Sequence, residues 1–158
     1  MDSGITIERA QGASDMGHIR DLFTEYQQWL GVDLCFQGFT GEMAELPGKY
    51  AEPAGCLLLA WEGETVIGGV GLWPLEKRIC EMKRLYVRPS GRGQGLGRRL
   101  AVAIIAEAKE RGYQSMRLDT LPQLSAALGL YRSLGFAETA PYYDNPLDGV
   151  SYLELDLG

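Results

Sequence analysis

Hydrophobic residues recur every three or four positions in several stretches of the chain, the spacing that gives a helix one buried face. In the first of these stretches Ile19, Leu22, Phe23 and Tyr26 follow this rule. Residues that cap or stop helices bound the stretches. The predicted helices are residues 14–30, begun by Ser14 or Asp15; residues 41–46; a helix from Leu96 to Gly112; and a helix from Pro122 to Gly135.

Between these helices lie short runs rich in apolar residues, a pattern typical of β-strands. Two runs, 55–61 and 65–73, are joined by Glu62-Gly63-Glu64, which predicts an antiparallel hairpin. A helix separates the run at 78–87 from the run at 115–120, so we expect these two to pair in parallel through a right-handed crossover. The remaining predicted strands are 5–7, 136–139 and 150–157.

The length and composition of the chain fit one globular domain. With 158 residues, 46% of them hydrophobic, it is long enough to bury one core, and residues 1–158 are predicted to form a single domain. The apolar runs are too short to span a bilayer and the N-terminus has no apolar leader, so we expect a cytoplasmic protein with no membrane partner. The net charge of -6 argues against nucleic acid as a partner.

Metal and disulfide chemistry are not indicated. Cys35, Cys56 and Cys80 are widely spaced, without a C-x-x-C pair, and His18 is the only histidine. The sequence offers neither a zinc-ligand set nor a disulfide framework, and no metal is expected. His18 is interpreted as a residue on a helix surface or at a helix cap.

Residues 82–99 combine the features of an anion-binding site. An extended apolar segment, Leu85-Tyr86-Val87, leads into a turn, Gly91-Arg92-Gly93-Gln94-Gly95-Leu96-Gly97, and then into a helix. Glycines let backbone N–H groups approach a phosphate, and the unpaired N–H groups and positive dipole end of a helix favour negative charge. We therefore expect a pyrophosphate site with arginines around it.

The spacing of these glycines excludes two common phosphate loops. A dinucleotide fingerprint needs glycine at the first, third and sixth positions, but the sixth residue is Leu96 when counted from Gly91 and Arg98 when counted from Gly93. A nucleoside triphosphate loop needs lysine and then serine or threonine after its last glycine, and neither is present.

The turn resembles the acetyl-CoA site of the GNAT superfamily of N-acetyltransferases. The family pattern is glutamine or arginine, two variable residues, glycine, one variable residue, then glycine or alanine, and Arg92-Gly93-Gln94-Gly95-Leu96-Gly97 meets it. A second stretch, Leu130-Tyr131-Arg132-Ser133-Leu134-Gly135-Phe136, resembles the family's helix-to-strand signature. The resemblance implies an α/β (α+β) fold: one GNAT-like domain with a mixed, mostly antiparallel central sheet of six to seven strands, about four flanking helices, and a splay at the central parallel strand pair.

The resemblance also implies acetyl-CoA as co-substrate. Its pyrophosphate is then expected on the N–H groups of residues 93–98, and its pantetheine arm along the strand at 85–87. N–H groups at a bulge in this strand would polarise the thioester carbonyl. The alternative is that the arginines are only solvated residues on a tight turn. The expected cofactor-binding residues are Leu85, Tyr86, Val87, Arg92, Gly93, Gln94, Gly95, Leu96, Gly97 and Arg98.

Two residues are candidates for proton transfer. By resemblance, Tyr131 matches the tyrosine that protonates the departing CoA thiolate in many family members; the alternative is a buried aromatic residue on a helix. Glu81, on the central strand, is the leading candidate for the base, with a solvated or structural carboxylate as the alternative. At Leu124 the chain departs from the family, which often has asparagine there and uses it to bind the cofactor. Other carboxylates that could act as the base are Glu25, Glu76 and Asp144.

Together these features predict an N-acetyltransferase that moves acetyl from acetyl-CoA directly to a primary amine of a small molecule or peptide. Direct transfer is favoured because no cysteine stands in a nucleophile constellation with a histidine. The alternative is a binding module of the same fold that senses acyl-CoA without catalysis, and a longer acyl group is left open. An acidic protein is compatible with a cationic acceptor, such as a polyamine, an aminoglycoside or a lysine side chain. A homodimer is a possible assembly.

Overall fold

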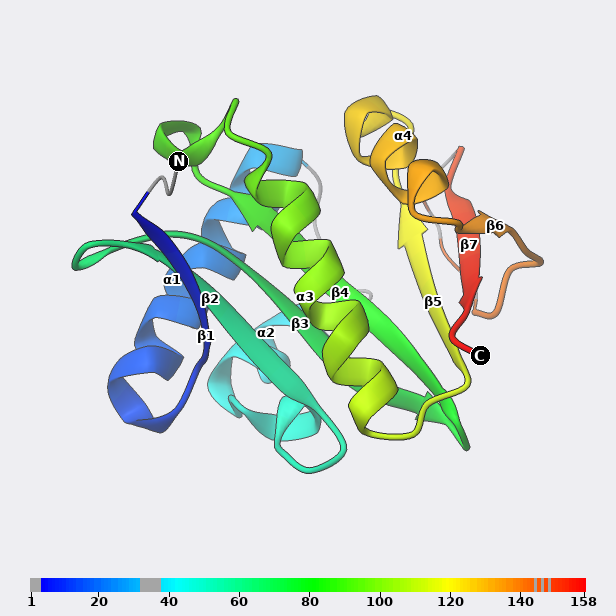
Figure 1. Ribbon diagram of the computed structural model, residues 1–158, viewed down its shortest axis with the longest axis horizontal. Helices are drawn as coiled ribbons and strands as arrows, with labels where there is room; N and C mark the ends of the chain where they lie inside the picture. Colours follow the sequence, from blue (N-terminus) through cyan, green and yellow to red (C-terminus); the bar gives the residue numbers. More distant parts are fainter. Residues whose placement is uncertain (1–3, 32–37, 144, 146, 148) are drawn as a thin grey trace.

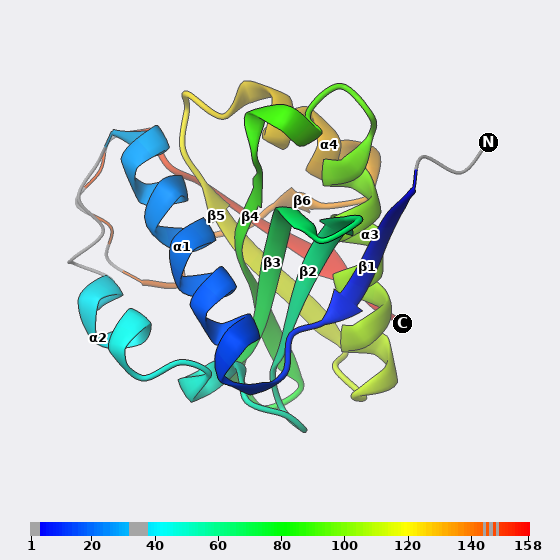
Figure 2. The same cartoon turned by 90° about the vertical axis from the view of Figure 1, so that its left-hand side faces the viewer.

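A computed structural model describes residues 4–31, 38–143, 145, 147 and 149–158. Over these residues a seven-stranded sheet, ordered β1-β2-β3-β4-β5-β7-β6, lies between two layers of helices (Figures 1 and 2). The strands are β1 (Ile5–Arg9), β2 (Cys56–Glu62), β3 (Thr65–Glu76), β4 (Ile79–Val87), β5 (Ser115–Thr120), β6 (Ala137–Glu138) and β7 (Ser151–Asp156). The helices are α1 (Gly12–Leu30), α2 (Phe39–Ala44), α3 (Leu96–Glu110) and α4 (Ser125–Ser133), with 3₁₀ turns at Gly48–Tyr50 and Pro89–Gly91.

Each face of the sheet carries its own hydrophobic cluster. The α3 side holds Leu72, Leu100, Ile104 and Met116, and the α1 side is built from the helical stripe that the sequence predicts, including Ile19, Leu22 and Phe23. Figure 2 shows α1 and α2 on one side of the sheet and α3 on the other. In the described part of the chain, no helix has the length and apolar character needed to cross a membrane.

The predicted fold class is confirmed, but three helices begin at other residues than expected. α2 spans Phe39–Ala44 rather than residues 41–46. α1 begins at Gly12, because Asp15 lies inside its first turn and accepts a hydrogen bond from the Gln11 N–H at 2.9 Å. The helix expected from Pro122 begins only at Ser125. The intervening residues form a turn closed by a 2.9 Å hydrogen bond from the Leu124 N–H to the Leu121 carbonyl.

The parallel pair at the centre of the sheet separates along its length. β4 and β5 are paired only at Ile79 with Ser115, Cys80 with Met116, and Glu81 with Arg117. Beyond Glu81 the two strands run on to Val87 and Thr120 without pairing, and Figure 1 shows them diverging. This confirms the expected splay.

A bulge in β4 lies beside the splay. Gly69 pairs with Tyr86 and Gly71 with Lys83, so β4 has one residue more than β3 over this interval. The extra residue reverses the alternation of side chains: Met82 lies in the α3-side cluster, whereas Tyr86 lies in the α1-side cluster. After the bulge, each side chain of β4 therefore lies on the face of the sheet opposite to the one that uninterrupted alternation would give it.

Candidate functional site

The glycine turn leaves an open surface at the start of α3. Gly93 and Gly95 have φ angles of 83° and 71°, in the left-handed region that favours glycine, and Gly95 is the N-cap of α3. A Cβ built on either glycine meets nothing within 4 Å. No side chain caps the first N–H groups of the helix. These N–H groups can therefore receive an anion from outside, which fits a pyrophosphate.

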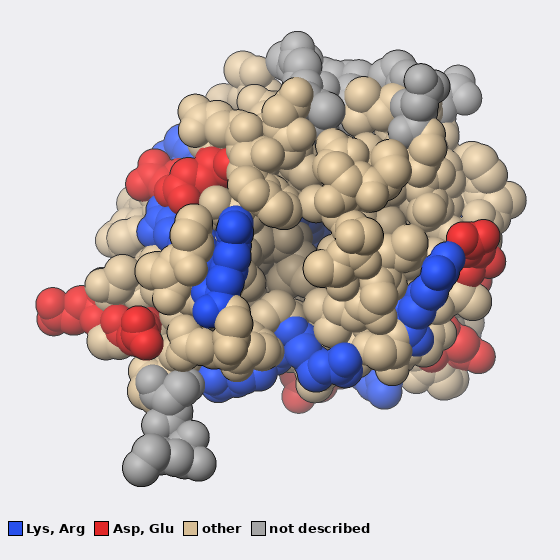
Figure 3. Space-filling model, turned by 90° about the horizontal axis from the view of Figure 1, so that it is seen from above, with Lys and Arg blue, Asp and Glu red and all other residues tan. Residues whose placement is uncertain are grey.

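The arginines of this region do not all face the turn. Arg98 Nη2 donates a 2.7 Å hydrogen bond to Ser133 Oγ on α4, and Arg92 Nε donates to the Val87 carbonyl at 3.0 Å. Arg99 instead reaches β1, where it bonds the Ile5 carbonyl at 3.1 Å. Figure 3 looks onto this end of the molecule and shows a hollow between mostly uncharged walls, with separate Lys and Arg side chains around it.

The other residues expected to bind the cofactor differ in what they can offer. The Leu96 side chain is buried in the α3-side core, so only its main chain is available. Tyr86 is also buried, with its ring 5.9 Å from that of Tyr26. Leu85 and Val87 are partly buried against the α3-side core. The strand edge at residues 85–87 thus offers backbone groups rather than side-chain donors.

A cavity of about 90 Å³ fills the space where β4 and β5 diverge, and we call it the splay cavity. Thr120 lies in its wall, and its Oγ1 is buried without a hydrogen-bond partner among the described residues. An orphaned buried hydroxyl is costly unless a ligand or water pairs with it, so the cavity fits a polar guest. Its lining includes Tyr26, Trp29, Met82, Lys83, Arg84, Leu85, Leu118, Asp119, Thr120, Leu124, Tyr131 and Asn145.

Tyr131 lies in the wall of the splay cavity. It is 7% exposed, and its ring meets that of Phe136 edge-on at 5.7 Å. Burial raises the pKa of Tyr131 well above its ordinary value of 10.0, because the phenolate would lose its hydration. The side chain therefore stays protonated at neutral pH and can act as a proton donor.

Glu81 lies at the end of the β4–β5 pairing, 4% exposed. Its Oε1 accepts a 2.7 Å hydrogen bond from Trp73 Nε1, and its Oε2 accepts one of 2.6 Å from the Tyr142 hydroxyl. Lys83 Nζ lies 3.8 Å from Oε1. Glu81 borders a second hollow of about 220 Å³, which we call the outer pocket; its lining is Lys49, Trp73, Pro74, Leu75, Glu81, Lys83, Tyr142 and Tyr143.

The two candidate residues for proton transfer thus lie in different hollows. Tyr131 lines the splay cavity and Glu81 the outer pocket, but the hollows are neighbours, because Lys83 lines both. The hydroxyl of Tyr143, in the outer pocket, also bonds Asp119 in the splay cavity. Lys83 therefore lies on the boundary between the outer pocket and the splay cavity.

Comparison with known proteins decides the family. The sequence model of the GNAT acetyltransferase family matches residues 18–136. This chain belongs to the GNAT family. An uncharacterised N-acetyltransferase of Schizosaccharomyces pombe is 43% identical over 157 residues, which cover 98% of this chain and 96% of that protein.

Solved GNAT structures share the fold. An acetyltransferase of Streptococcus agalactiae superposes with a TM-score of 0.81 at 19% identity, covering 98% of this chain and 99% of that one. An acetyltransferase of Salmonella typhimurium, solved with its cofactor acetyl-CoA, superposes with a TM-score of 0.71 at 23% identity, covering 99% and 95%. At these identities the likeness concerns the fold, and the residue roles in this GNAT protein rest on its own geometry.

The competing carboxylates lie outside both hollows or outside the described residues. Glu25 forms an ion pair with Arg88 at 2.6 Å, and Glu76 pairs with Arg117 at 3.1 Å. Neither lines the splay cavity or the outer pocket. Asp144 lies outside the described residues. Glu81 is thus the only one of these described candidates that borders a hollow of the site.

Four charged residues that line the two hollows were not predicted from the sequence: Lys49, Lys83, Arg84 and Asp119. Lys83 is 6% exposed, and burial lowers its pKa, opposed in part by the charge of Glu81. Asp119 lines the splay cavity and accepts hydrogen bonds from Tyr143 and Asn145. The available signal was the presence of charged residues inside two central strands, at positions 81, 83 and 119, which implies a polar site within the sheet.

Among the described residues, no three His, Cys, Asp or Glu side chains are grouped as metal ligands. Cys56 and Cys80 are buried, and burial raises the pKa of their thiols to about 11 and about 12. His18 meets the ring of Trp61 edge-on at 5.2 Å. Cys35 lies outside the described residues.

Proposed function

We propose that this protein transfers an acetyl group from acetyl-CoA directly to a primary amine of a small molecule or peptide. When bound, acetyl-CoA supplies an activated acyl group, and the Salmonella relative was solved with it. The N–H groups of residues 93–98 and the Arg98 side chain would hold the pyrophosphate, and the edge of β4 at residues 85–87 would hold the pantetheine arm.

The splay cavity is the observation that carries this proposal. It opens the sheet between two strands, near the end of β4 that leads into the glycine turn, and it contains the protonated Tyr131 and the unpaired Thr120 hydroxyl. A thioester in this cavity would be shielded from water. Such shielding strengthens the effect of hydrogen-bond donors on its carbonyl oxygen.

The proposed reaction involves two separate proton transfers, one to the leaving group and one from the amine. The amine nitrogen forms a bond to the thioester carbon, the carbon–sulfur bond breaks, and the CoA thiolate takes the proton of the Tyr131 hydroxyl. The proton released by the amine goes to a base, and Glu81 is our candidate because it borders the pocket next to the cavity. Tyr131 regains its proton from solvent after the product leaves.

The test is release of CoA thiol from acetyl-CoA in the presence of a broad panel of primary amines, with the acetylated products identified by mass spectrometry. Because Cys56 and Cys80 are buried and their pKa values are raised, they should add little to the thiol signal. If CoA binds tightly but no amine releases thiol, the protein is a non-catalytic acyl-CoA-binding module and the proposal is wrong.

A further inference from the structure

The outer pocket differs in charge from the protein as a whole. The chain has a net charge of -6, yet the described lining of this pocket has two ammonium groups, Lys49 and Lys83, against one carboxylate, Glu81. Both ammonium nitrogens lie 4.9 Å from the centre of the Trp73 ring. This local charge favours an anionic group and disfavours the polycationic acceptors with which the net charge is compatible.

Glu81 does not satisfy the ammonium group of Lys83. The 3.8 Å between Lys83 Nζ and Glu81 Oε1 is too long for a hydrogen bond, although Lys83 is only 6% exposed. Each oxygen of Glu81 already accepts a hydrogen bond, one from Trp73 and one from Tyr142. An ammonium that is not hydrogen-bonded to its neighbouring carboxylate is stabilised by an additional charged acceptor, and a ligand carboxylate is such an acceptor.

The position of Lys83 limits the distance between that carboxylate and the reacting amine. Lys83 lines both hollows, so a carboxylate bound to it would lie on the boundary between the outer pocket and the splay cavity. An amine one carbon away from the carboxylate would then point into the cavity. Pro74, Leu75 and Tyr142 line the rest of the outer pocket, which favours an apolar or aromatic group on the acceptor.

We propose that the acceptor is a free α-amino acid with an apolar or aromatic side chain, its carboxylate held by Lys83 and Lys49. This inference rests on the proposed acetyl transfer at the same site. Its test therefore includes a binding measurement that does not depend on turnover.

Binding is tested by thermal unfolding of the full chain in the presence of CoA. We compare L-phenylalanine with phenethylamine and L-leucine with 3-methylbutylamine, pairs that differ only by the carboxylate, and we include spermidine. A ligand present at about 100 times its dissociation constant stabilises the folded protein enough to raise its melting temperature by several degrees. The amino acids should raise it, and the decarboxylated amines and spermidine should not.

Turnover is tested with Lys83→Met, Lys49→Met and the control Lys77→Met, an exposed residue in the turn between β3 and β4. Loss of Lys83 should lower kcat/KM for L-phenylalanine by about tenfold or more and change that for phenethylamine much less. For each substrate, kcat/KM of the variant is divided by that of the wild type, so the different basicities of the two amines do not affect the comparison. Lys49→Met should have a smaller effect of the same kind, and Lys77→Met none.

The outcomes separate the two proposals. The amino-acid proposal is wrong if phenethylamine or spermidine binds and reacts as well as L-phenylalanine, or if Lys83→Met lowers kcat/KM equally for both members of a pair. If amino acids raise the melting temperature but no acetylation follows, the carboxylate site stands and the proposed acetyl transfer fails. A Lys83→Met variant that still binds CoA like the wild type has kept its fold.

Discussion

Arg84 and Glu42 form a buried ion pair that ties the bulge of β4 to α2. Arg84 Nη2 donates to Glu42 Oε1 at 2.9 Å and Nε to Oε2 at 3.0 Å, and the two side chains are 2% and 8% exposed. The Tyr50 hydroxyl donates a third hydrogen bond to Glu42 at 2.7 Å. Arg84 itself has a φ of 57°, a left-handed conformation that costs a non-glycine residue about 1–2 kcal/mol. The ion pair therefore holds the bulge beside the splay cavity.

Glu42→Ala tests this role. It leaves the Arg84 guanidinium buried without its carboxylate, a loss that typically costs about 3–5 kcal/mol of unfolding free energy. We expect this destabilisation in urea unfolding, together with lower turnover, because the bulge is no longer held. Glu45→Ala, at the exposed end of the same helix, is the control and should leave both quantities nearly unchanged. Equal stability of the two variants would show that the pair does not hold the bulge.

Arg98→Ala tests the phosphate site. Arg98 stands in the first turn of α3, where a charge-assisted hydrogen bond to a phosphate contributes about 1.5–3 kcal/mol, so we expect CoA to bind roughly ten to a hundred times more weakly. Titration calorimetry measures this directly. The control is Arg132→Ala on α4, an exposed arginine that pairs with Glu138 at 3.0 Å. Equal weakening by both variants would indicate a general effect of net charge rather than a site.

Tyr131→Phe tests the proton donor. We expect turnover to fall by about 100-fold or more, as for loss of a general acid, while the KM for acetyl-CoA stays within about a factor of two. Because burial raises the pKa of Tyr131 above 10.0, wild-type activity should show no loss from its ionisation as the pH rises toward 10. Tyr113→Phe, which removes a hydroxyl bonded to the Ala54 carbonyl, is the matched control. An unchanged rate in the Tyr131 variant would remove it as the acid.

Glu81→Gln separates a base from a structural carboxylate. The amide can still accept the hydrogen bond from Trp73, but buried Lys83 loses the neighbouring charge, so we expect some loss of stability. Loss of a general base should in addition lower turnover by about 100-fold or more. Tyr142→Phe removes the hydrogen bond to Oε2 but keeps the carboxylate, and it should cost far less activity. A stability loss in Glu81→Gln without a comparable loss of rate would identify Glu81 as an anchor for Trp73 and Tyr142.

The bulge in β4 is the part of the sheet that could not be predicted from the sequence. The local pattern predicts β5 at Ser115–Thr120, where it is observed, because strict alternation of polar and apolar residues defines that strand. The splay, by contrast, was expected from the family resemblance and not from the local pattern. In β4, however, one extra residue changes which face Tyr86 lies on relative to Met82, and no local pattern marks the position of such an insertion.

The charged residues of the site depend on contacts that are distant in the sequence. The partner of Arg84 is Glu42, in a segment expected only as a short helix, and the neighbours of Lys83 come from β3 and from the segment after β6. Lys83 is two residues from Glu81 on the same strand and so shares its face, but the residues that make a pocket around both are set by the tertiary fold and were not predicted from the sequence.

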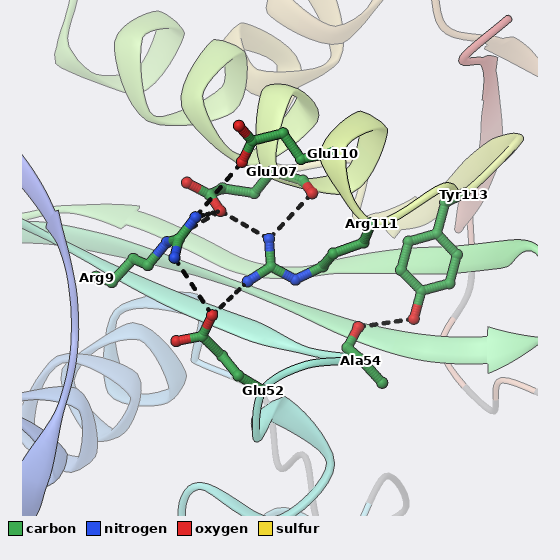
Figure 4. A network of polar contacts seen from close by, with 7 residues as sticks. All are labelled: Arg9, Glu52, Ala54, Glu107, Glu110, Arg111 and Tyr113. Carbon is green, nitrogen blue, oxygen red and sulfur yellow. Dashed lines mark hydrogen bonds and ion pairs between the residues drawn. The ribbon is translucent and has the colours of Figure 1, made fainter.

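A second network of charges lies away from the site, where β1 meets the end of α3 (Figure 4). Glu107 accepts hydrogen bonds of 2.7 Å from both Arg9 and Arg111, and Arg111 also bonds Glu52 at 2.8 Å. Burial raises the pKa of Glu107, but the hydrogen bonds from Arg111 and Arg9 lower it by more. The pKa of Glu107 is therefore below its ordinary value of 4.5. The network therefore joins three segments through one carboxylate.

Glu107→Gln should cost about 1–2 kcal/mol of unfolding free energy at neutral pH, because it weakens two charge-assisted hydrogen bonds at a partly buried site. The pKa of Glu107 is lower in the folded than in the unfolded protein, so its contribution is complete above pH 4.5 and is lost as the pH falls through the folded-state value. The stability difference between wild type and variant should therefore shrink below pH 4.5, measured by urea unfolding across pH. Glu110→Gln, whose side chain is 70% exposed and 3.4 Å from Arg9, should show neither the loss nor its pH dependence.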